Sequence, residues 1–295
     1  STTDKVLPDE NRMINGFTDY EELTRTRRLI MRSYKLPGNR LRLLHTNENR
    51  GAVTINEERD YHFRYVLEDN FGNRRTYQFT VKGKRQNIPE YKPETNEMLY
   101  WNRTNVIQKL GMELMVPRYH VYEDVPLRTD MRGDSSLIAF DYILDAGRTP
   151  IHSYCDLSIG LRHMPVADTT KYYIVQKAGK WRSSMGGKYA NGWIKTRVRS
   201  LGTFSVDVDT IAPQITPIGQ SGWRTSRNIR FRIKDMESGI GSHKVYIDGK
   251  FVLFGLKKGI LVIQDPEKVK KGVPHKLEVT VTDQCGNMAR KEYKF

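Results

Sequence analysis

The histidines and acidic residues decide whether this chain can hold a catalytic zinc. A zinc hydrolase needs His, Asp or Glu side chains at spacings that bring several ligands to one face. The chain has 7 histidines, and no two of them are separated by a single residue. His120 and Asp124 have an i, i+4 spacing, which would point both side chains to one face of an extended segment before Pro126. No second cluster completes a ligand set, so we interpret His120 as a hydrogen-bonded surface histidine.

Motifs for nucleophilic catalysis and phosphate binding are missing from the sequence. Gly-x-Ser-x-Gly does not occur, and residues 235–239 are better explained as a turn formed by Ser238 and Gly239. Gly186 and Gly187 precede Lys188 without the spacing of a phosphate loop, so they predict a flexible turn. We therefore expect no catalytic residue, no metal ligand and no cofactor in this chain.

Calcium is the metal that the sequence leaves open. It takes carboxylate and carbonyl oxygens as ligands. The acidic residues that could gather at one end of the C-terminal region are Asp207, Asp209, Asp235, Glu237 and Asp283. The chain has no Asp-x-Asp-x-Asp run in one loop, which makes calcium the less favoured interpretation.

The basic charge of the chain is spread evenly. Lys and Arg outnumber Asp and Glu by 15, with an excess of 5 in residues 1–85, 4 in 86–206 and 6 in 207–295. With no recognition motif and no local concentration of charge, nucleic acid is not an expected partner. The expected partner is an anionic polymer of the cell envelope. The alternative interpretation of the basic residues that would contact it is that they form a solvated strand face. These residues are Arg230, Arg232, Lys234, Lys268, Lys270 and Lys271.

Two β-hairpins share one turn sequence, Asp-x-x-Gly-Asn, at residues 69–73 and 283–287. The Asp side chain can accept bonds from the turn amides, and Gly permits a positive φ between alternating strands. The repeat indicates that one kind of β domain is used at least twice. We expect the two hairpins to close the first and last sandwiches, with Cys285 as a turn residue packed against the end of the last one.

The fold class predicted is all-β, with tandem immunoglobulin-like β-sandwich domains and one short helix in the first. We place an incomplete immunoglobulin-like domain at 1–88, a middle sandwich at 89–206 and a C-terminal immunoglobulin-like sandwich at 207–295. The boundaries rest on the proline-containing linker 86–96 and on the strand that ends in Asp-Thr-x-x-Pro at 209–213.

Short alternating segments supply the expected strands. In the first domain they are 40–44, 52–55 and the first hairpin, beside a helix near 18–32 that the capping box at 18–21 predicts. In the middle domain they are 113–117, 136–140, 156–161, 171–175 and 194–198. In the last domain, residues 229–234 alternate and the dipeptide Asp248-Gly249 predicts a tight hairpin.

No apolar run approaches the ~20 residues needed to span a bilayer, so no transmembrane segment is expected. The chain starts at Ser1 without a signal peptide or initiator Met, which favours a mature product or a fragment that has lost its export signal. The 2 cysteines, Cys155 and Cys285, cannot form a disulfide framework, and we expect both to be free thiols, buried or half-buried.

Several segments in a fixed order resemble a known family. The segments are 10–20, 37–41, the Asp69 hairpin, 189–193, 201–204, 209–213, 238–240 and 247–249. Over nearly the whole chain, this order is similar to the region downstream of the catalytic domain in bacterial lysostaphin-like zinc peptidoglycan endopeptidases. The resemblance is to the long form, which carries several C-terminal β domains.

The resemblance implies where the protein acts and that this chain has no catalytic zinc site. The family holds zinc with a His-x-x-x-Asp pair and a His from a later His-x-His, and no His-x-His occurs here. No catalytic residue carries over, and zinc is expected only in an upstream catalytic domain outside this chain. The resemblance also implies that strands of the first domain precede Ser1, and that the protein acts in the bacterial cell envelope, periplasmic or exported.

Two hypotheses for function follow. In the first, the chain is the non-catalytic accessory region of a cell-wall metallopeptidase, and it positions the hydrolase or binds peptidoglycan or another anionic envelope polymer. Its partners are then that polymer and its own upstream catalytic domain. In the second, the chain is a stand-alone glycan-binding or adhesive β-sandwich module. Aromatic side chains would form its sugar-stacking platform, at Tyr100, Trp101, Trp181, Tyr189 and Trp193.

Overall fold

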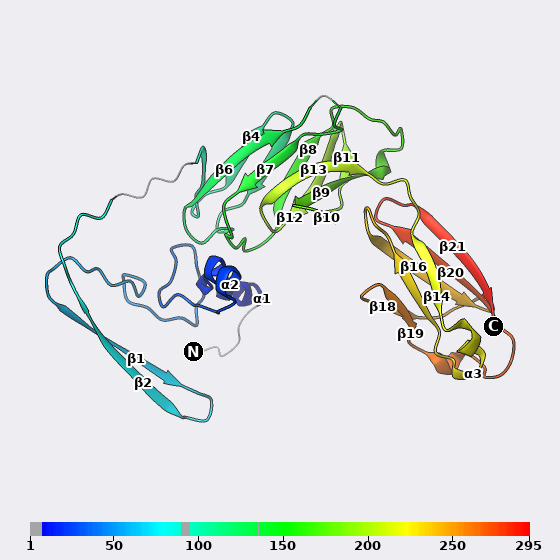
Figure 1. Ribbon diagram of the computed structural model, residues 1–295, viewed down its shortest axis with the longest axis horizontal. Coiled ribbons are helices and arrows are strands. Elements are labelled where there is room, and N and C mark those ends of the chain that lie inside the picture. Colours follow the sequence, from blue (N-terminus) through cyan, green and yellow to red (C-terminus); the bar gives the residue numbers. More distant parts are fainter. Residues whose placement is uncertain (1–7, 90–94, 135) are drawn as a thin grey trace. The chain divides into compact units, whose positions relative to one another are not determined.

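The computed structural model describes residues 8–89, 95–134 and 136–295. The chain divides into two compact units, residues 1–94 and 95–295 (Figure 1). Regular structure is mostly antiparallel β-sheet with a few short helices, so the predicted all-β fold class is confirmed. The three-domain division stays a prediction, and part of its first linker, residues 90–94, lies outside the described residues. No helix in the described residues is long and apolar enough to cross a membrane.

The first unit begins with three short helical segments: α1 (Pro8–Met13), the 3-10 helix η1 (Ile14–Phe17) and α2 (Tyr20–Thr26). Asp19 caps α2, because its side chain accepts a hydrogen bond from the Glu22 N–H at 2.9 Å. Arg27 then takes a left-handed conformation, with φ of 64°, and ends the helix. The single helix predicted near 18–32 is therefore too long, and Asp19 is the cap.

The core of the first unit is small. Its buried apolar side chains are Met13, Phe17, Leu36, Leu41 and Tyr61. Residues 40–44 and 52–55 are not strands, which corrects the prediction. Alternating side chains make a strand only where a second segment pairs with it, and within the described residues neither segment has such a partner.

The first predicted hairpin is confirmed as β1 (Asp60–Glu68) and β2 (Arg74–Lys82). At the turn, Asp69 Oδ1 accepts from the N–H groups of Phe71 and Asn73, both at 2.9 Å. The expectation that this hairpin closes a sandwich is wrong, because within the described residues β1 and β2 pair only with each other.

The second unit contains two pairs of sheets. The first pair has strand orders β10-β9-β13-β7-β6-β3 and β11-β12-β8-β5-β4. Its strands are β3 (Glu97–Leu99), β4 (Asn105–Lys109), β5 (Met112–Val116), β6 (Val125–Arg132), β7 (Asp141–Asp145), β8 (Cys155–Gly160), β9 (Tyr172–Ala178), β10 (Trp181–Ser184), β11 (Lys188–Ala190), β12 (Trp193–Val198) and β13 (Gly202–Val208), with the 3-10 helix η2 (Thr169–Lys171) before β9.

The two sheets of this middle sandwich share one apolar core. Leu157 and Ile159 enter it from β8, and Phe204 enters it from β13 of the facing sheet. Four of the five strands predicted for this region coincide with β5, β8, β9 and β12. The prediction for 136–140 is wrong, because this segment has no regular structure and the strand β7, which pairs with β6, begins only after it, at Asp141.

The last sandwich is built from sheets of strand order β14-β15-β19-β18 and β17-β16-β20-β21. Trp223 and Phe231 are fully buried in its core. Its elements are β14 (Gln214–Ile218), η3 (Gln220–Gly222), α3 (Trp223–Ser226), β15 (Arg230–Lys234), β16 (Ile240–Ile247), β17 (Lys250–Phe251), β18 (Phe254–Lys257), β19 (Ile260–Ile263), η4 (Pro266–Lys268), β20 (Lys276–Asp283) and β21 (Met288–Lys294).

Candidate functional site

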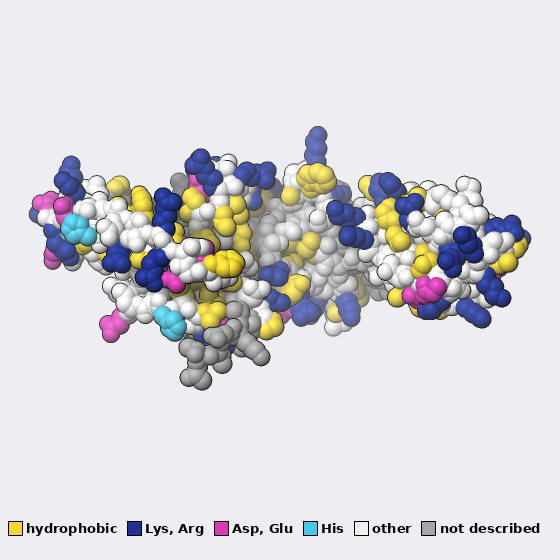
Figure 2. Space-filling model, turned by 90° about the horizontal axis from the view of Figure 1, so that it is seen from below, with side chains coloured by type: hydrophobic (Ala, Val, Ile, Leu, Met, Phe, Trp, Pro, Cys, Tyr) yellow, Lys and Arg dark blue, Asp and Glu magenta, His cyan; other side chains and the backbone are white. Residues whose placement is uncertain are grey.

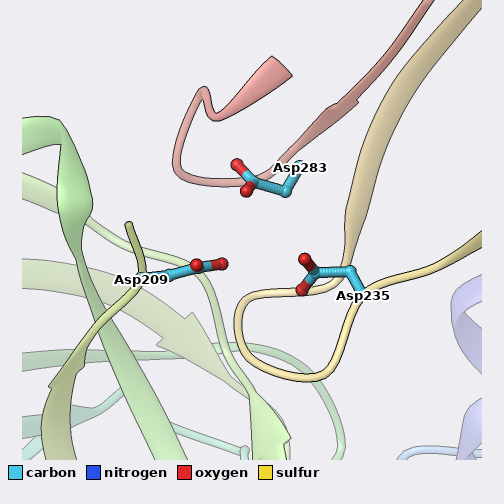
Figure 3. Close-up of side chains that lie close together, drawn as sticks. All are labelled: Asp209, Asp235 and Asp283. Atoms are coloured by element: carbon cyan, nitrogen blue, oxygen red, sulfur yellow. The ribbon is translucent and has the colours of Figure 1, made fainter. Parts of the chain in front are cut away.

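Three carboxylates from distant segments meet at one end of the last sandwich. Asp209 follows β13, Asp235 follows β15, and Asp283 ends β20. One oxygen of each lies within 4.8 Å of the others, and the side chains converge in Figure 3. The other two acidic residues singled out in the sequence have different partners: Asp207 pairs with Arg182 at 2.7 Å, and Glu237 accepts from the Tyr173 hydroxyl at 3.4 Å.

Asp209 ties the segment between the sandwiches to the turn after β15. Its side chain is fully buried. Oδ2 accepts from the N–H of Ser238 at 3.0 Å and from its hydroxyl at 2.5 Å. Oδ1 accepts from the Ile211 N–H at 2.9 Å. The Asp-Thr-x-x-Pro segment is therefore held by Ser238, which the sequence indicated only as a turn residue.

Asp283 organises the second Asp-x-x-Gly-Asn turn. Oδ1 accepts from the N–H groups of Cys285 and Asn287, both at 2.8 Å, and Oδ2 accepts from Asn287 Nδ2 at 2.7 Å. Burial raises the pKa of Asp283 above its ordinary value, and the negative charge of Asp209 adds to this, while the bonds from Asn287 oppose it. The turn of the same sequence at Asp69 is exposed. There the pKa of Asp69 is lowered, chiefly by the hydrogen bond from the Asn73 side chain.

The third carboxylate, Asp235, is also engaged by protein donors. Its Oδ1 accepts from the N–H groups of Glu237 at 3.1 Å and Gly239 at 2.7 Å. Oxygen ligands of this kind suit calcium. Each of the three carboxylates nevertheless accepts at least two hydrogen bonds from the protein, so we describe the cluster as a hydrogen-bonded joint.

The joint also binds the two sandwiches of the second unit to each other. Lys171, the last residue of η2, donates from Nζ to the Cys285 carbonyl at 3.0 Å. The buried side chains of Tyr173, Val175 and Cys285 form a small apolar cluster of their own. Both cysteines are free and buried, as the sequence predicted. Cys285 therefore has a packing role between the sandwiches.

A basic face lies on the outside of the sheet β14-β15-β19-β18. Arg230, Arg232 and Lys234 of β15 are exposed and alternate with the buried Phe231 and Ile233. Because β15 pairs with β19 and β19 with β18, Arg232, Ile260 and Lys257 stand in one row across the sheet. We define Arg230, Arg232, Lys234 and Lys257 as the basic face. Within the described residues, none of the four has a carboxylate partner.

The opposite sheet of the same sandwich differs in its charge pattern. On the strands β20 and β21, Lys276 pairs with Glu278 at 3.1 Å and with Glu292 at 3.2 Å. Arg290 pairs with Glu278 at 2.6 Å. Lys276 and Arg290 are thus compensated by Glu278 and Glu292, whereas the cations of the basic face are not. Other lysines of the same sheet, such as Lys244 and Lys294, have no carboxylate partner within the described residues. Figure 2 shows Lys and Arg side chains spread over the visible surface, as the even charge distribution predicted.

Lys268, Lys270 and Lys271 lie in and after η4, and they do not belong to the strand β15. Lys268 is paired with Asp265 at 2.6 Å. The Lys270 carbonyl oxygen lies 2.7 Å from His275 Nε2. These three residues therefore form a separate group. Lys257 was missed in the sequence, because only the strand register brings it into line with Arg232.

The histidine and aromatic candidates lie on several different elements. His120 and Asp124 lie in turns before β6, not on a strand, which corrects the geometry expected for them. Asp124 accepts from the Trp101 N–H at 3.2 Å. The five predicted platform aromatics belong to both sheets of the middle sandwich and to the loop after β3: Tyr100, Trp101, Trp181, Tyr189 and Trp193.

Comparison with known protein families finds a match for one part of the chain. Residues 96–209, which cover the middle sandwich, match the Zu5-like domain. No curated protein matches the chain. One similar solved structure is described as a Ca2+-stabilized adhesin that helps an Antarctic bacterium reach out and bind ice. It is 10% identical, the match covers 80% of each chain, and the TM-score is 0.21.

Proposed function

We propose that the chain is an adhesive β-sandwich module of the bacterial cell envelope, which binds an anionic polymer such as peptidoglycan through the basic face. The observation that carries the proposal is the set of four uncompensated cations on one sheet, in contrast to Lys276 and Arg290 of the opposite sheet, which are paired with Glu278 and Glu292. A cation already held by a carboxylate gains little from a second anion, whereas an unpaired one is free to bind.

The spacing of the basic face suits a polymer with repeated negative groups. Residues two apart on a strand stand ~7 Å apart, and neighbouring strands are separated by about 4.8 Å. Arg230, Arg232 and Lys234 thus form a line along β15, and Lys257 lies about 10 Å to one side, two strands away. Arg can hold carboxylate or phosphate with two parallel hydrogen bonds.

The joint supports an adhesive role in a second way. A module that holds a polymer under load benefits from domains that do not hinge freely. The bonds Ser238 to Asp209, Asn287 to Asp209 and Lys171 to Cys285 resist such hinging. The two bonds to Asp209 lie between buried groups, which cost more to break than exposed ones.

The test is retention on insoluble peptidoglycan at low and high salt. The triple variant Arg230→Gln, Arg232→Gln, Lys234→Gln is compared with a matched variant of the opposite sheet, Lys276→Gln, Arg290→Gln, Lys291→Gln, which removes the same charge. We expect the first variant to bind about tenfold more weakly and the second to bind like wild type. Equal loss in both variants, or no retention of wild type at low salt, would overturn the proposal.

A second context for the module is the accessory region of a zinc peptidoglycan endopeptidase. It is supported by the segments 209–213 and 238–240, which carry part of the resemblance and meet at the joint. Neither the Zu5-like match nor the adhesin is specific to peptidases. The test is digestion of peptidoglycan by the parent protein with the basic face intact or neutralised. A selective loss on insoluble peptidoglycan, with soluble fragments cleaved normally, is the expected result.

A further inference from the structure

The ribbon of β1 and β2 in the first unit has one apolar and one polar face. Residues directly opposite each other in an antiparallel pair point to the same side. On one side the register brings together Tyr61 with Val81, Phe63 with Phe79, Tyr65 with Tyr77, and Leu67 with Arg75. On the other side it brings together His62 with Thr80, Arg64 with Gln78, Val66 with Thr76, and Glu68 with Arg74. We call the first side the aromatic face.

The aromatic face is exposed over most of its length. Leu67 is 68% exposed, Tyr77 64% and Tyr65 42%. The rings of the face contact one another, with centroids 5.1 Å apart for Phe63 and Phe79 and 5.7 Å for Tyr77 and Phe79. Continuous apolar surface of this kind is rare on a free monomer and marks an interaction site.

The rest of the first unit leaves the aromatic face open. At the base, the Tyr61 hydroxyl accepts from the N–H groups of Asn56 and Glu57, so the chain covers Tyr61 there. Further along, the Tyr65 hydroxyl donates to Ser33 Oγ at 3.1 Å. A two-stranded ribbon is marginally stable by itself and needs a second layer. Within the described residues of the first unit, no second sheet covers the ribbon.

We propose that the aromatic face is a self-association surface, on which the ribbons of two copies pack face to face as a four-stranded sandwich. The exposed parts of its side chains amount to roughly 500–600 Å² per copy, or about 1,100 Å² for two, close to the lower limit of a stable interface. A two-fold arrangement uses one patch twice and needs no other partner. The area predicts a weak dimer that forms at micromolar concentration.

The charges at the ends of the ribbon fit an antiparallel arrangement of the two copies. Arg75 stands at the tip of the aromatic face, and within the described residues it has no carboxylate partner. Glu57 lies at the base, where its N–H donates to the Tyr61 hydroxyl and its exposed side chain pairs with Arg59 at 2.7 Å. Antiparallel packing places the tip of one ribbon over the base of the other, and so brings Arg75 near Glu57 of the second copy.

The test is sedimentation of the full chain over a concentration series. Wild type is compared with Tyr77→Lys, Phe79→Lys on the aromatic face and with Thr76→Lys, Gln78→Lys on the polar face. The two variants add equal charge to the same strand. We expect wild type to shift from monomer to dimer as concentration rises. The aromatic-face variant should raise the dimer dissociation constant at least 100-fold, and the polar-face variant should leave it within threefold.

A second measurement covers the case in which the lysines unfold the ribbon. Tyr77→Cys should give a disulfide-linked dimer under mild oxidation, and Thr76→Cys on the other face should not, while the native Cys155 and Cys285 are buried and do not compete. A wild type that sediments as a monomer up to about 100 µM, well above the concentration at which an interface of this size associates, would overturn the proposal. Equal weakening by both lysine variants would overturn it too, and would leave the aromatic face to a different protein.

Discussion

Asn287 joins two segments that are 78 residues apart: its Nδ2 donates to the main-chain oxygen of Asp209 at 3.0 Å and to Asp283 Oδ2 at 2.7 Å. Both acceptors belong to buried residues of the joint. One side chain amide therefore holds the last turn of the chain against the segment that enters the last sandwich.

Replacing this amide should destabilise the last sandwich. Asn287→Ala leaves two buried acceptors without a donor, and we expect the free energy of unfolding to fall by about 2 kcal/mol. The measurement is urea unfolding followed by tryptophan fluorescence. Asn73→Ala is the matched control, because Asn73 makes the same bond to Asp69 Oδ2 at 2.8 Å in an exposed turn. The control should leave the transition of the last sandwich unchanged, and an equal effect of both variants would contradict the role of burial.

The pKa values of the aspartates in the two turns should be shifted in opposite directions. Burial raises the pKa of Asp283, and the Asn73 hydrogen bond lowers that of Asp69. Carbon-detected NMR titration of the two carboxyl groups checks this directly. The expected midpoints lie above the ordinary Asp value for Asp283 and below it for Asp69. Matching midpoints would show that the joint is more open to water than its geometry indicates.

The raised pKa of Asp283 has a defined effect on stability. A carboxyl that holds its proton more tightly in the folded state contributes most stability below its unfolded pKa, and that contribution is lost as pH rises through the folded pKa. Asp283→Asn should remove this loss, so that the difference in stability between variant and wild type changes as pH rises above the ordinary Asp pKa. The measurement is made in EDTA. A shift in wild type on adding calcium would instead show that the cluster takes up a cation.

The local features of the fold could be predicted from the sequence, and the long-range ones could not. The turns at Asp69 and Asp283 follow from five consecutive residues, and both are present. The alternation of Arg230 to Lys234 likewise gave the exposed face of β15. In contrast, the row formed by Arg232 and Lys257 depends on the pairing of three strands, which no local pattern encodes.

The wrong strand predictions also arise from contacts between residues that are far apart in the sequence. Residues 40–44 alternate like a strand, yet Leu41 is held in a loop by the bond from its N–H to Asn39 Oδ1 at 3.1 Å. Asn39 in turn donates to the Met13 carbonyl, 26 residues earlier. Tertiary hydrogen bonds of this kind override a weak local preference. The bond from Asn287 to Asp209 was likewise hidden, because it joins residues far apart in the sequence.

The two thiols should be unreactive in the folded protein. Burial raises the pKa of Cys155 to about 12 and that of Cys285 to about 11, so neither forms thiolate at pH 8. Iodoacetamide without reductant should leave the mass of native protein unchanged and add two adducts in guanidinium chloride. Faster labelling of Cys285 than of Cys155 would be the sign that the joint opens locally. Labelling of both in native protein would contradict their burial.

The joint between the sandwiches rests in part on Tyr173, which is 2% exposed and packs with Val175 and Cys285. Tyr173→Ala removes a buried ring and should cost about 3 kcal/mol, through lost burial and the cavity left behind. Because the ring lies between the sandwiches, we expect their unfolding transitions in calorimetry to separate further than in wild type. Tyr173→Phe keeps the ring and loses only the 3.4 Å bond to Glu237, so it should behave nearly like wild type. If Phe and Ala variants shift the transitions equally, the hydroxyl and not the apolar packing couples the two sandwiches.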